Sequence, residues 1–480
     1  MVQYWFDGDK HEVKPAPHGN AKKNRMPFRR TRQSTKDKLR VAATTMQPKR
    51  AYNQTKATIG RTYDLPSIAA APRDPMQAKN FRKMSGNQSH QFKESNCSDC
   101  QDHSDPLFAV LLQCKEQQGD LNTAFVREVR CAPEPEVVCA TQQQLVDTER
   151  FCCNPHQFTV LGVDPSFNVG KFCYTLTTYR HLMVVDKVTG KHPVMIGPIL
   201  FHMRKLEASY KLLTSTMVNL NPNLSRLMSF GTDGEYNVAK AFSDQFVFAM
   251  QMRCKKHLED NIESAMVRIG IPAKMRREIL VDIFGVQEGS TKYFGLADAS
   301  NTVDFDEKLG HLQHKWAEAD PMGLEFGEWF RRNSVKVIKD SMLRPLREQC
   351  QLGSPPDFYY NNGNESMNKV YQKWCKESSG KRQLSMSEAT REMRALVAQR
   401  QMDVEDAIFG VGPYKIIPEF KHLEVETAVF KSMSKEQRLA AVKRFNKVTT
   451  FHFHTYTDTV LIHACVYVLS ISIMLSWVCI

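Results

Sequence analysis

Two apolar stretches of the sequence each run directly into an aspartate, and this pattern constrains the fold more than any other feature. The first is FTVLGVDPSFNVGKFCYT, in which residues 158–163 lead to Asp164 and apolar residues then alternate from Phe172 onward. The second is LMSFGTDGEY, in which residues 227–230 lead towards Asp233. Apolar runs and a period of two indicate strands, and Pro or Gly after each acid indicates a turn. We therefore predict two strands that each end at a carboxylate.

A third acid, Glu365, is predicted in the first turn of a helix. The turn at residues 361–364 can cap this helix, and an apolar stripe follows at Met367, Val370, Tyr371 and Trp374. Glu365 lies on the opposite face with Asn368 and Gln372, so we expect it to face away from the core. Carboxylates from three elements suit Mg2+ or Mn2+. The alternatives are turn-forming aspartates and a glutamate that favours the helix dipole.

Four short motifs occur in a fixed order along the chain: VDPSFNVG, FGTDGE, CKKHLEDNI and NNGNESMN. In this order they resemble the catalytic domain of Mutator-like (MULE-type) DDE transposases, a branch of the RNase H-like superfamily. The resemblance covers roughly residues 158–376. It implies a catalytic triad that follows the first strand, the fourth strand and the start of a late helix, and these residues are Asp164, Asp233 and Glu365.

The same resemblance implies supporting residues. Cys254 and His257 match a Cys-x2-His signature after the fifth strand, and Asn368 matches the last position of an acid-Ser-x-Asn pattern. A thiol and an imidazole at this place would position the second aspartate, as outer groups orient metal ligands. Glu235 is predicted as a further outer neighbour of the acids.

The predicted fold class is α/β, with an RNase H-like mixed sheet flanked by helices. This catalytic domain is expected at residues 157–450, with a large all-helical insertion at about 273–350 before the last catalytic acid. Basic residues of the insertion are expected either to line a DNA channel or to form solvated helix faces: Arg276, Arg277, Arg331, Arg332, Lys336, Arg344 and Arg347.

Positive charge is concentrated at the start of the chain. The 480 residues carry a net charge of +13, and the first fifty hold 13 Lys and Arg against 4 Asp and Glu. Residues 1–94 show little hydrophobic periodicity, so we predict a basic, mostly disordered region. Such a region suits contact with the phosphate backbone of nucleic acid or recognition for nuclear import. The alternative is a solvated, disordered leader without such a role. Residues 95–156 are predicted as a small pre-domain.

The cysteines are expected to be reduced thiols inside the cell, because the first residues lack an apolar signal segment. Cys97, Cys100 and His103 have the spacing of part of a zinc site, which needs four ligands. No partner pair is obvious, and free buried cysteine is the preferred interpretation.

The last residues form an apolar segment, 459–480, without a formal charge, and its length would allow it to cross a bilayer. A membrane anchor, sequence read through from beyond a broken element and a buried core segment are the three alternatives. An anchor would hold the protein at a membrane, which conflicts with a nuclear enzyme.

The sequence therefore predicts a transposase, or its relic, that cleaves and joins DNA by two-metal phosphoryl transfer in the nucleus. The ions would be Mg2+ or Mn2+, held by Asp164, Asp233 and Glu365. The expected partners are transposon ends and target DNA, with a homo-oligomer left open. The alternative is a catalytically inactive, transposase-derived factor that binds DNA or protein.

Overall fold

The computed structural model describes residues 30–84, 106–117, 119–120, 123–167, 169–288, 291–379 and 383–448. Three predicted features lie outside these ranges: most of the basic arm at residues 1–29, the zinc spacing of Cys97, Cys100 and His103, and the apolar segment 459–480. No helix within the described ranges is long and apolar enough to cross a membrane.

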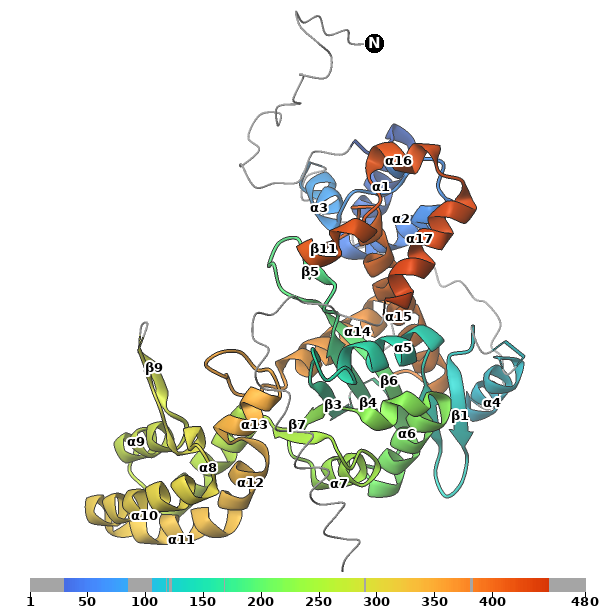
Figure 1. The fold of residues 1–480 in the computed structure, drawn as a ribbon. Coiled ribbons are helices and arrows are strands. Elements are labelled where there is room, and N and C mark those ends of the chain that lie inside the picture. The colour runs from blue at the N-terminus through green and yellow to red at the C-terminus, as the bar shows by residue number, and fades with distance from the viewer. Residues whose placement is uncertain are drawn as a thin grey trace, which may run out of the picture.

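A seven-stranded mixed sheet forms the centre of the protein (Figure 1). Its strands, in spatial order, are β1 (Val126–Arg130), β2 (Glu136–Cys139), β6 (Val194–His202), β4 (Cys173–Arg180), β3 (Leu161–Ser166), β7 (Ser229–Thr232) and β8 (Met250–Arg253). The last three strands are parallel to one another, and every other neighbouring pair is antiparallel. With helices on its faces, this sheet confirms the predicted α/β class.

Helices cover both faces of the sheet, because its strands are apolar on both sides. One face packs against α5 (Gln142–Cys152), α6 (Glu207–Leu220) and α7 (Tyr236–Gln245). The other face packs against α4 (Pro106–Gln117), α14 (Asn362–Ser379) and α15 (Met386–Ile408). Alternate residues of β6 show the division, since Leu200 joins the first core while Ile199 and Phe201 join the second.

Residues 106–152 belong to this sheet domain, which corrects the predicted pre-domain at 95–156. β2 pairs antiparallel with β6 through Val138 and Leu200, and α5 buries Leu145 and Phe151 in the first core. A hairpin of two short strands is marginal alone. β1 and β2 therefore extend the larger sheet.

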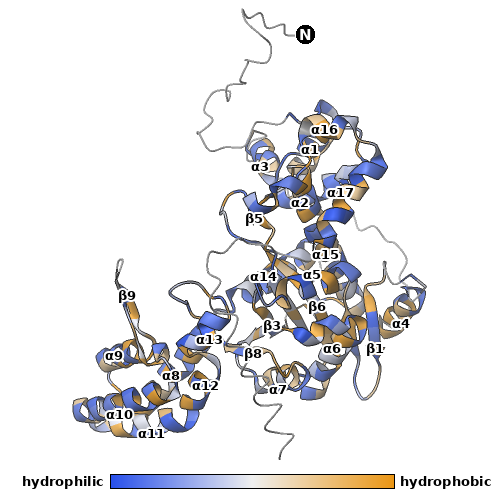
Figure 2. Ribbon diagram, in the orientation of Figure 1, coloured by the Kyte–Doolittle hydropathy of each residue, from blue (hydrophilic) through white to orange (hydrophobic). Residues whose placement is uncertain are grey.

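A helical insertion lies between β8 and α14. Its helices are α8 (Lys255–Ile269), α9 (Ala273–Phe284), α10 (Thr302–Ala319), α11 (Pro321–Asn333), α12 (Val335–Ser341) and α13 (Arg344–Gln349). Its own core contains Trp316, Phe326 and Phe330. Figure 2 shows hydrophobic and hydrophilic residues alternating around these helices, as amphipathic packing requires.

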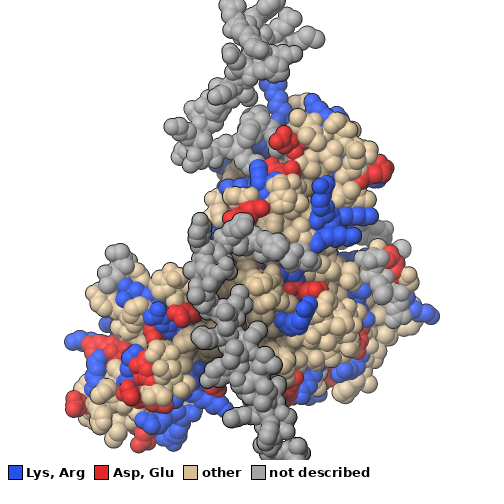
Figure 3. Space-filling model, viewed as in Figure 1, with Lys and Arg blue, Asp and Glu red and all other residues tan. Residues whose placement is uncertain are grey.

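The insertion differs from the predicted all-helical segment at about 273–350 in two ways. It begins with α8, and it contains a hairpin of β9 (Val286–Glu288) and β10 (Thr291–Tyr293). Strands of three residues are too short to produce a periodic signal in sequence. On the visible face of the insertion, basic and acidic residues are interspersed (Figure 3).

Three helices form a small unit near the N-terminus, which corrects the prediction that residues 1–94 are mostly disordered. They are α1 (Gln33–Thr45), α2 (Pro48–Ile59) and α3 (Pro75–Met84). The apolar residues of their buried cluster are few and mostly small: Leu39, Ala43, Ala51, Tyr52 and Ala78. Alanine contributes little to a hydrophobic pattern, so periodicity does not reveal this core.

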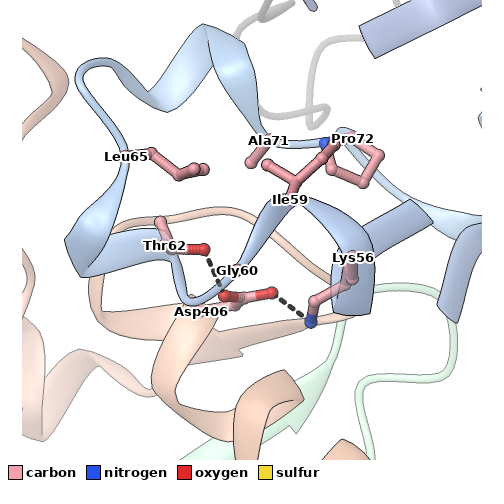
Figure 4. Close-up of a pocket in the computed structure, with 8 residues that line it drawn as sticks. All are labelled: Lys56, Ile59, Gly60, Thr62, Leu65, Ala71, Pro72 and Asp406. Carbon is pink, nitrogen blue, oxygen red and sulfur yellow. Dashed lines mark hydrogen bonds and ion pairs between the residues drawn. The ribbon is translucent and has the colours of Figure 1, made fainter. Parts of the chain in front are cut away.

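A buried ionic contact joins this unit to α15 (Figure 4). The amine of Lys56 lies 2.9 Å from Asp403 and 2.5 Å from Asp406, and the hydroxyl of Thr62 donates to Asp406 at 2.6 Å. Burial lowers the pKa of Lys56, but the two carboxylates outweigh this effect and raise it above its ordinary value. Lys56, Thr62 and Asp406 line a pocket together with Ile59, Gly60, Leu65, Ala71 and Pro72. The unit therefore contacts α15 through buried charged and polar groups.

The end of the described chain returns to the N-terminal unit. α15 starts with a capping box, in which the Ser385 hydroxyl accepts the N–H of Glu388 at 3.3 Å. β11 (Tyr414–Ile416) then pairs with β5 (Val184–Asp186) in a separate ribbon. The last helices are α16 (Thr427–Ser432) and α17 (Lys435–Lys447).

Candidate active site

Asp164 and Asp233 follow paired positions of two neighbouring parallel strands. Val163 of β3 pairs with Thr232 of β7, so the next residue of each strand comes at the same level of the sheet. β3 does not stop at Asp164 as predicted, because β4 pairs with it to its last residue. Pro165 is tolerated in this extension, since β7 pairs with β3 no further than Val163 and leaves an open edge.

Two asparagine side chains hold the carboxylate of Asp164. Nδ2 of Asn361 donates to Oδ1 at 3.0 Å, and Nδ2 of Asn368 donates to Oδ2 at 2.6 Å. Asn361 directly precedes α14, and its carbonyl accepts the N–H of Glu365 at 3.1 Å. Positions 361, 365 and 368 share one face of a helix. Glu365 therefore lies on the face that contacts Asp164.

This polar face of α14 covers the end of β3, which corrects the expectation that Glu365 faces away from the core. Asn368 is buried. Nε2 of Gln372 donates to the carbonyl of Phe167 at 3.2 Å and to the hydroxyl of Tyr174 at 3.3 Å. Helical periodicity separates polar from apolar faces, but it does not distinguish a polar face in solvent from one packed on a polar site.

The three predicted acids interact electrostatically. The pKa of Asp164 is raised from 3.8 to about 7, first by burial and then by the negative charges of Asp233 and Glu365. The hydrogen bond from Asn361 acts in the opposite direction. In the part of the chain that the structure describes, no three Asp, Glu, His or Cys side chains stand in a ready arrangement for a metal ion. The negative charges of Asp233 and Glu365 thus act on Asp164 at one end of the sheet.

Cys254 connects the strand ends to the helix that bears Glu365. It precedes α8, its N–H donates to the carbonyl of Thr232 at 3.0 Å, and its sulfur accepts the N–H of Asn361 at 3.3 Å. The thiol therefore positions Asn361, where the sequence predicted a contact with the second aspartate. Nδ1 of His257 is buried and has no hydrogen-bond partner among the described residues. The supporting role of His257 stays a prediction.

Two strand glycines allow the segment before α14 and the first turn of α14 to approach the sheet, a feature that sequence reasoning missed. A Cβ on Gly231 would lie 2.2 Å from the ring of Tyr359, and a Cβ on Gly162 would lie 2.6 Å from Oδ1 of Asn364. The Tyr359 hydroxyl donates to Oδ1 of Asn361 at 3.2 Å and so orients one of the two amides that bind Asp164. Glycine inside a predicted strand was the available signal, because it marks close approach of another segment.

Glu235, the predicted outer neighbour, forms a charged pair beside the acids. Nζ of Lys205 lies 2.7 Å from its Oε2, and the hydroxyl of Tyr210 donates to its Oε1 at 2.8 Å. Burial lowers the pKa of Lys205, but Glu235 and Asp233 outweigh this effect and raise it. The ammonium group in turn favours ionised Asp164. Sequence reasoning did not identify this cation.

Arg347, one of the residues predicted to line a DNA channel, is instead buried. Its guanidinium lies 2.5 Å from Asp298 and over the ring of Phe358 at 4.1 Å. Arg332, another member of that set, lies 3.3 Å from Glu328 on its own helix. These pairs favour the alternative of structural and solvated arginines for both residues.

Comparison with protein-family models and curated proteins identifies no relative of this chain. No protein-family model matches the chain, and no curated protein matches its sequence.

Proposed function

We propose that the protein is a DDE-type DNA transposase, or a descendant of one, with its reaction centre at Asp164, Asp233 and Glu365. One observation carries the proposal: Asp164 is half-buried at the end of a mixed sheet, where burial and two other acids raise its pKa. Among the strands of the seven-stranded sheet, counted along the chain from β3, the acids belong to the first strand, the turn after the fourth strand (β7) and a late helix, while Cys254 follows the fifth (β8). The resemblance to Mutator-like transposases and to the RNase H-like superfamily implies the same order.

The chemistry of this site suits Mg2+ or Mn2+. Both ions prefer hard oxygen ligands, and the site offers carboxylates. Oδ1 of Asn368 is an additional buried oxygen with no hydrogen-bond partner among the described residues. Asp164, Asp233 and Glu365 would hold the ions. When bound, two such ions supply an activated water or 3′-hydroxyl and stabilise the leaving oxygen.

The protein's own groups prepare Asp164 for this role. Asn361 and Asn368 fix both carboxylate oxygens, so the side chain cannot rotate away from the strand end. A pKa of about 7 means that the carboxylate is partly protonated at neutral pH. A nearby cation would favour its ionised form.

One observation favours the second candidate, a catalytically inactive factor that binds DNA or protein. Both oxygens of Asp164 already accept hydrogen bonds, and these bonds can stabilise the acid as a structural group. In such a factor the fold would present a surface to its partner without cleaving DNA.

Plasmid nicking distinguishes the two candidates. The purified full chain should nick supercoiled plasmid in Mn2+ or Mg2+ and lose this activity in EDTA. Asp164→Asn and Glu365→Gln should each lower the rate more than about 100-fold, because groups that merely orient metal ligands already contribute 10- to 100-fold. Nicking by Asp164→Asn at the wild-type rate would refute the proposal.

Asp186→Asn is the matched control. Oδ1 of Asp186 accepts the N–H groups of Val188 and Thr189 at 2.9 Å and 2.8 Å, and an asparagine oxygen can accept the same bonds. This variant should nick at the wild-type rate. Localisation of the full chain to the nucleus is a separate part of the proposal and can be observed directly in cells.

A further inference from the structure

Arg253 is a cation beside the acids that the proposed mechanism does not use. It is the last residue of β8 and pairs in register with Thr232, the residue before Asp233. Its Nε is buried and has no hydrogen-bond partner among the described residues. Burial lowers the pKa of Arg253, and the charge of Asp233 acts against this effect. A further negatively charged group beside this guanidinium would therefore be stabilised.

The turn after Asp233 packs closely against this guanidinium. A Cβ on Gly234 would lie 0.5 Å from Nη1 and 1.4 Å from Cζ of Arg253, so any side chain here would displace it. Gly234 also has a φ of +102°, which other residues rarely adopt. The backbone conformation thus favours glycine, and the absence of a side chain leaves room for the guanidinium against the turn that carries the second acid.

A buried arginine donor without an acceptor needs a partner, because burying a polar group without a hydrogen bond is unfavourable. A guanidinium presents a planar fork of donors that matches the oxygens of a phosphate. Phosphodiester oxygens are also repelled by clustered carboxylates, so a cation at this position would offset that repulsion.

We propose that Arg253 binds a non-bridging oxygen of the DNA phosphate at the reaction centre. This inference rests on the proposed function, because it names the group that contacts the substrate phosphate. The alternative is that Arg253 only neutralises Asp233. A phosphate contact predicts weaker binding of DNA as well as slower cleavage, whereas neutralisation predicts a change in metal requirement alone.

The first test measures binding of a labelled DNA duplex by anisotropy at several salt concentrations, with Ca2+ in place of Mn2+. Each phosphate contact contributes about 0.9 to the slope of log K against log salt. Arg253→Gln should lower that slope by about this amount, and Arg253→Lys should retain it. Arg130→Gln is the control, because Arg130 pairs with Glu136 at 3.1 Å on β1, at the opposite edge of the sheet. An unchanged slope in Arg253→Gln would overturn the proposal.

The second test measures plasmid nicking over a range of Mn2+ concentrations. Arg253→Gln should nick at least about 100-fold more slowly at saturating Mn2+, as expected when one charge-stabilising donor is removed, and Arg253→Lys should be intermediate. Full recovery at high Mn2+ would instead support neutralisation of Asp233. A wild-type protein that binds the duplex but never nicks would defeat the proposed function, and the salt slope would still decide whether Arg253 contacts a phosphate.

Discussion

Asp164 carries a negative charge that the folded protein disfavours. Its pKa rises from 3.8 to about 7 on folding, so the folded protein holds the proton more tightly than the unfolded chain does. The free energy of unfolding should therefore fall as the pH rises from about 4 to about 7 and then level off. Three pKa units correspond to at most roughly 4 kcal/mol, so this single side chain has a measurable effect.

Asp164→Asn should remove this pH dependence. We expect the variant to be more stable than the wild type at pH 8 by up to a few kcal/mol, and to lose the advantage near pH 4. The NH2 group of an asparagine at position 164 would face the donating NH2 groups of Asn361 and Asn368. The side-chain amide of Asn368 can flip, however, so that its Oδ1, which has no hydrogen-bond partner among the described residues, accepts a hydrogen bond. Urea denaturation at the two pH values measures the difference. Equal destabilisation at both values would contradict the electrostatic interpretation.

The residues around the acids show what a single sequence can and cannot predict. Asp164 and Asp233 were identifiable, because each follows an apolar run. The hydrogen bond from Asn361 to Asp164 and the guanidinium of Arg253 beside Asp233 were not identifiable, because asparagine in a turn and arginine at a strand end are common. Their roles depend on contacts between segments far apart in the chain, which local patterns do not contain.

β7 and the segment before α14 meet closely at one glycine. Because a Cβ on Gly231 would overlap the ring of Tyr359 at 2.2 Å, Gly231→Ala should displace that ring and the Asn361 amide bonded to it. Overpacking of this kind costs about 1–3 kcal/mol. Thermal denaturation should show the loss, together with slower nicking.

Gly310→Ala provides the control for that substitution. Gly310 lies inside α10, and a Cβ there would meet nothing within 4 Å. Alanine in a helix interior is favoured over glycine by about 0.5–1 kcal/mol, so this variant should be slightly more stable and nick normally. A neutral Gly231→Ala would mean that Tyr359 can move without affecting the site.

Secondary structure was predictable to different degrees. The strands β3 and β4 and the amphipathic helix α14 were indicated by periodicity, because each buries a continuous set of apolar residues. The hairpin β9–β10 and the helices α1 and α2, which bury few apolar side chains, were missed, since short strands and small apolar stripes give little contrast. Their order comes from tertiary contacts.

At the scale of the whole molecule, the sheet domain has helical bodies attached to it. The insertion enters directly after β8 and leaves before α14, so both of its ends lie at the strand termini that carry the acids. The N-terminal unit instead contacts α15 through Lys56, Asp403 and Asp406. This arrangement places the insertion, and not the N-terminal unit, next to the proposed reaction centre.

Titration of the full chain with Mn2+ at pH 8, followed by the loss of free Mn2+ signal, tests the central claim most directly. If the three acids hold two ions, the wild type should bind two Mn2+ per chain, Asp164→Asn should bind neither tightly, and Asp233→Asn and Glu365→Gln should each lose one. Binding should also weaken at pH 6, because protons then compete for Asp164, whose pKa is about 7. Wild-type stoichiometry and affinity in Asp164→Asn would contradict the account.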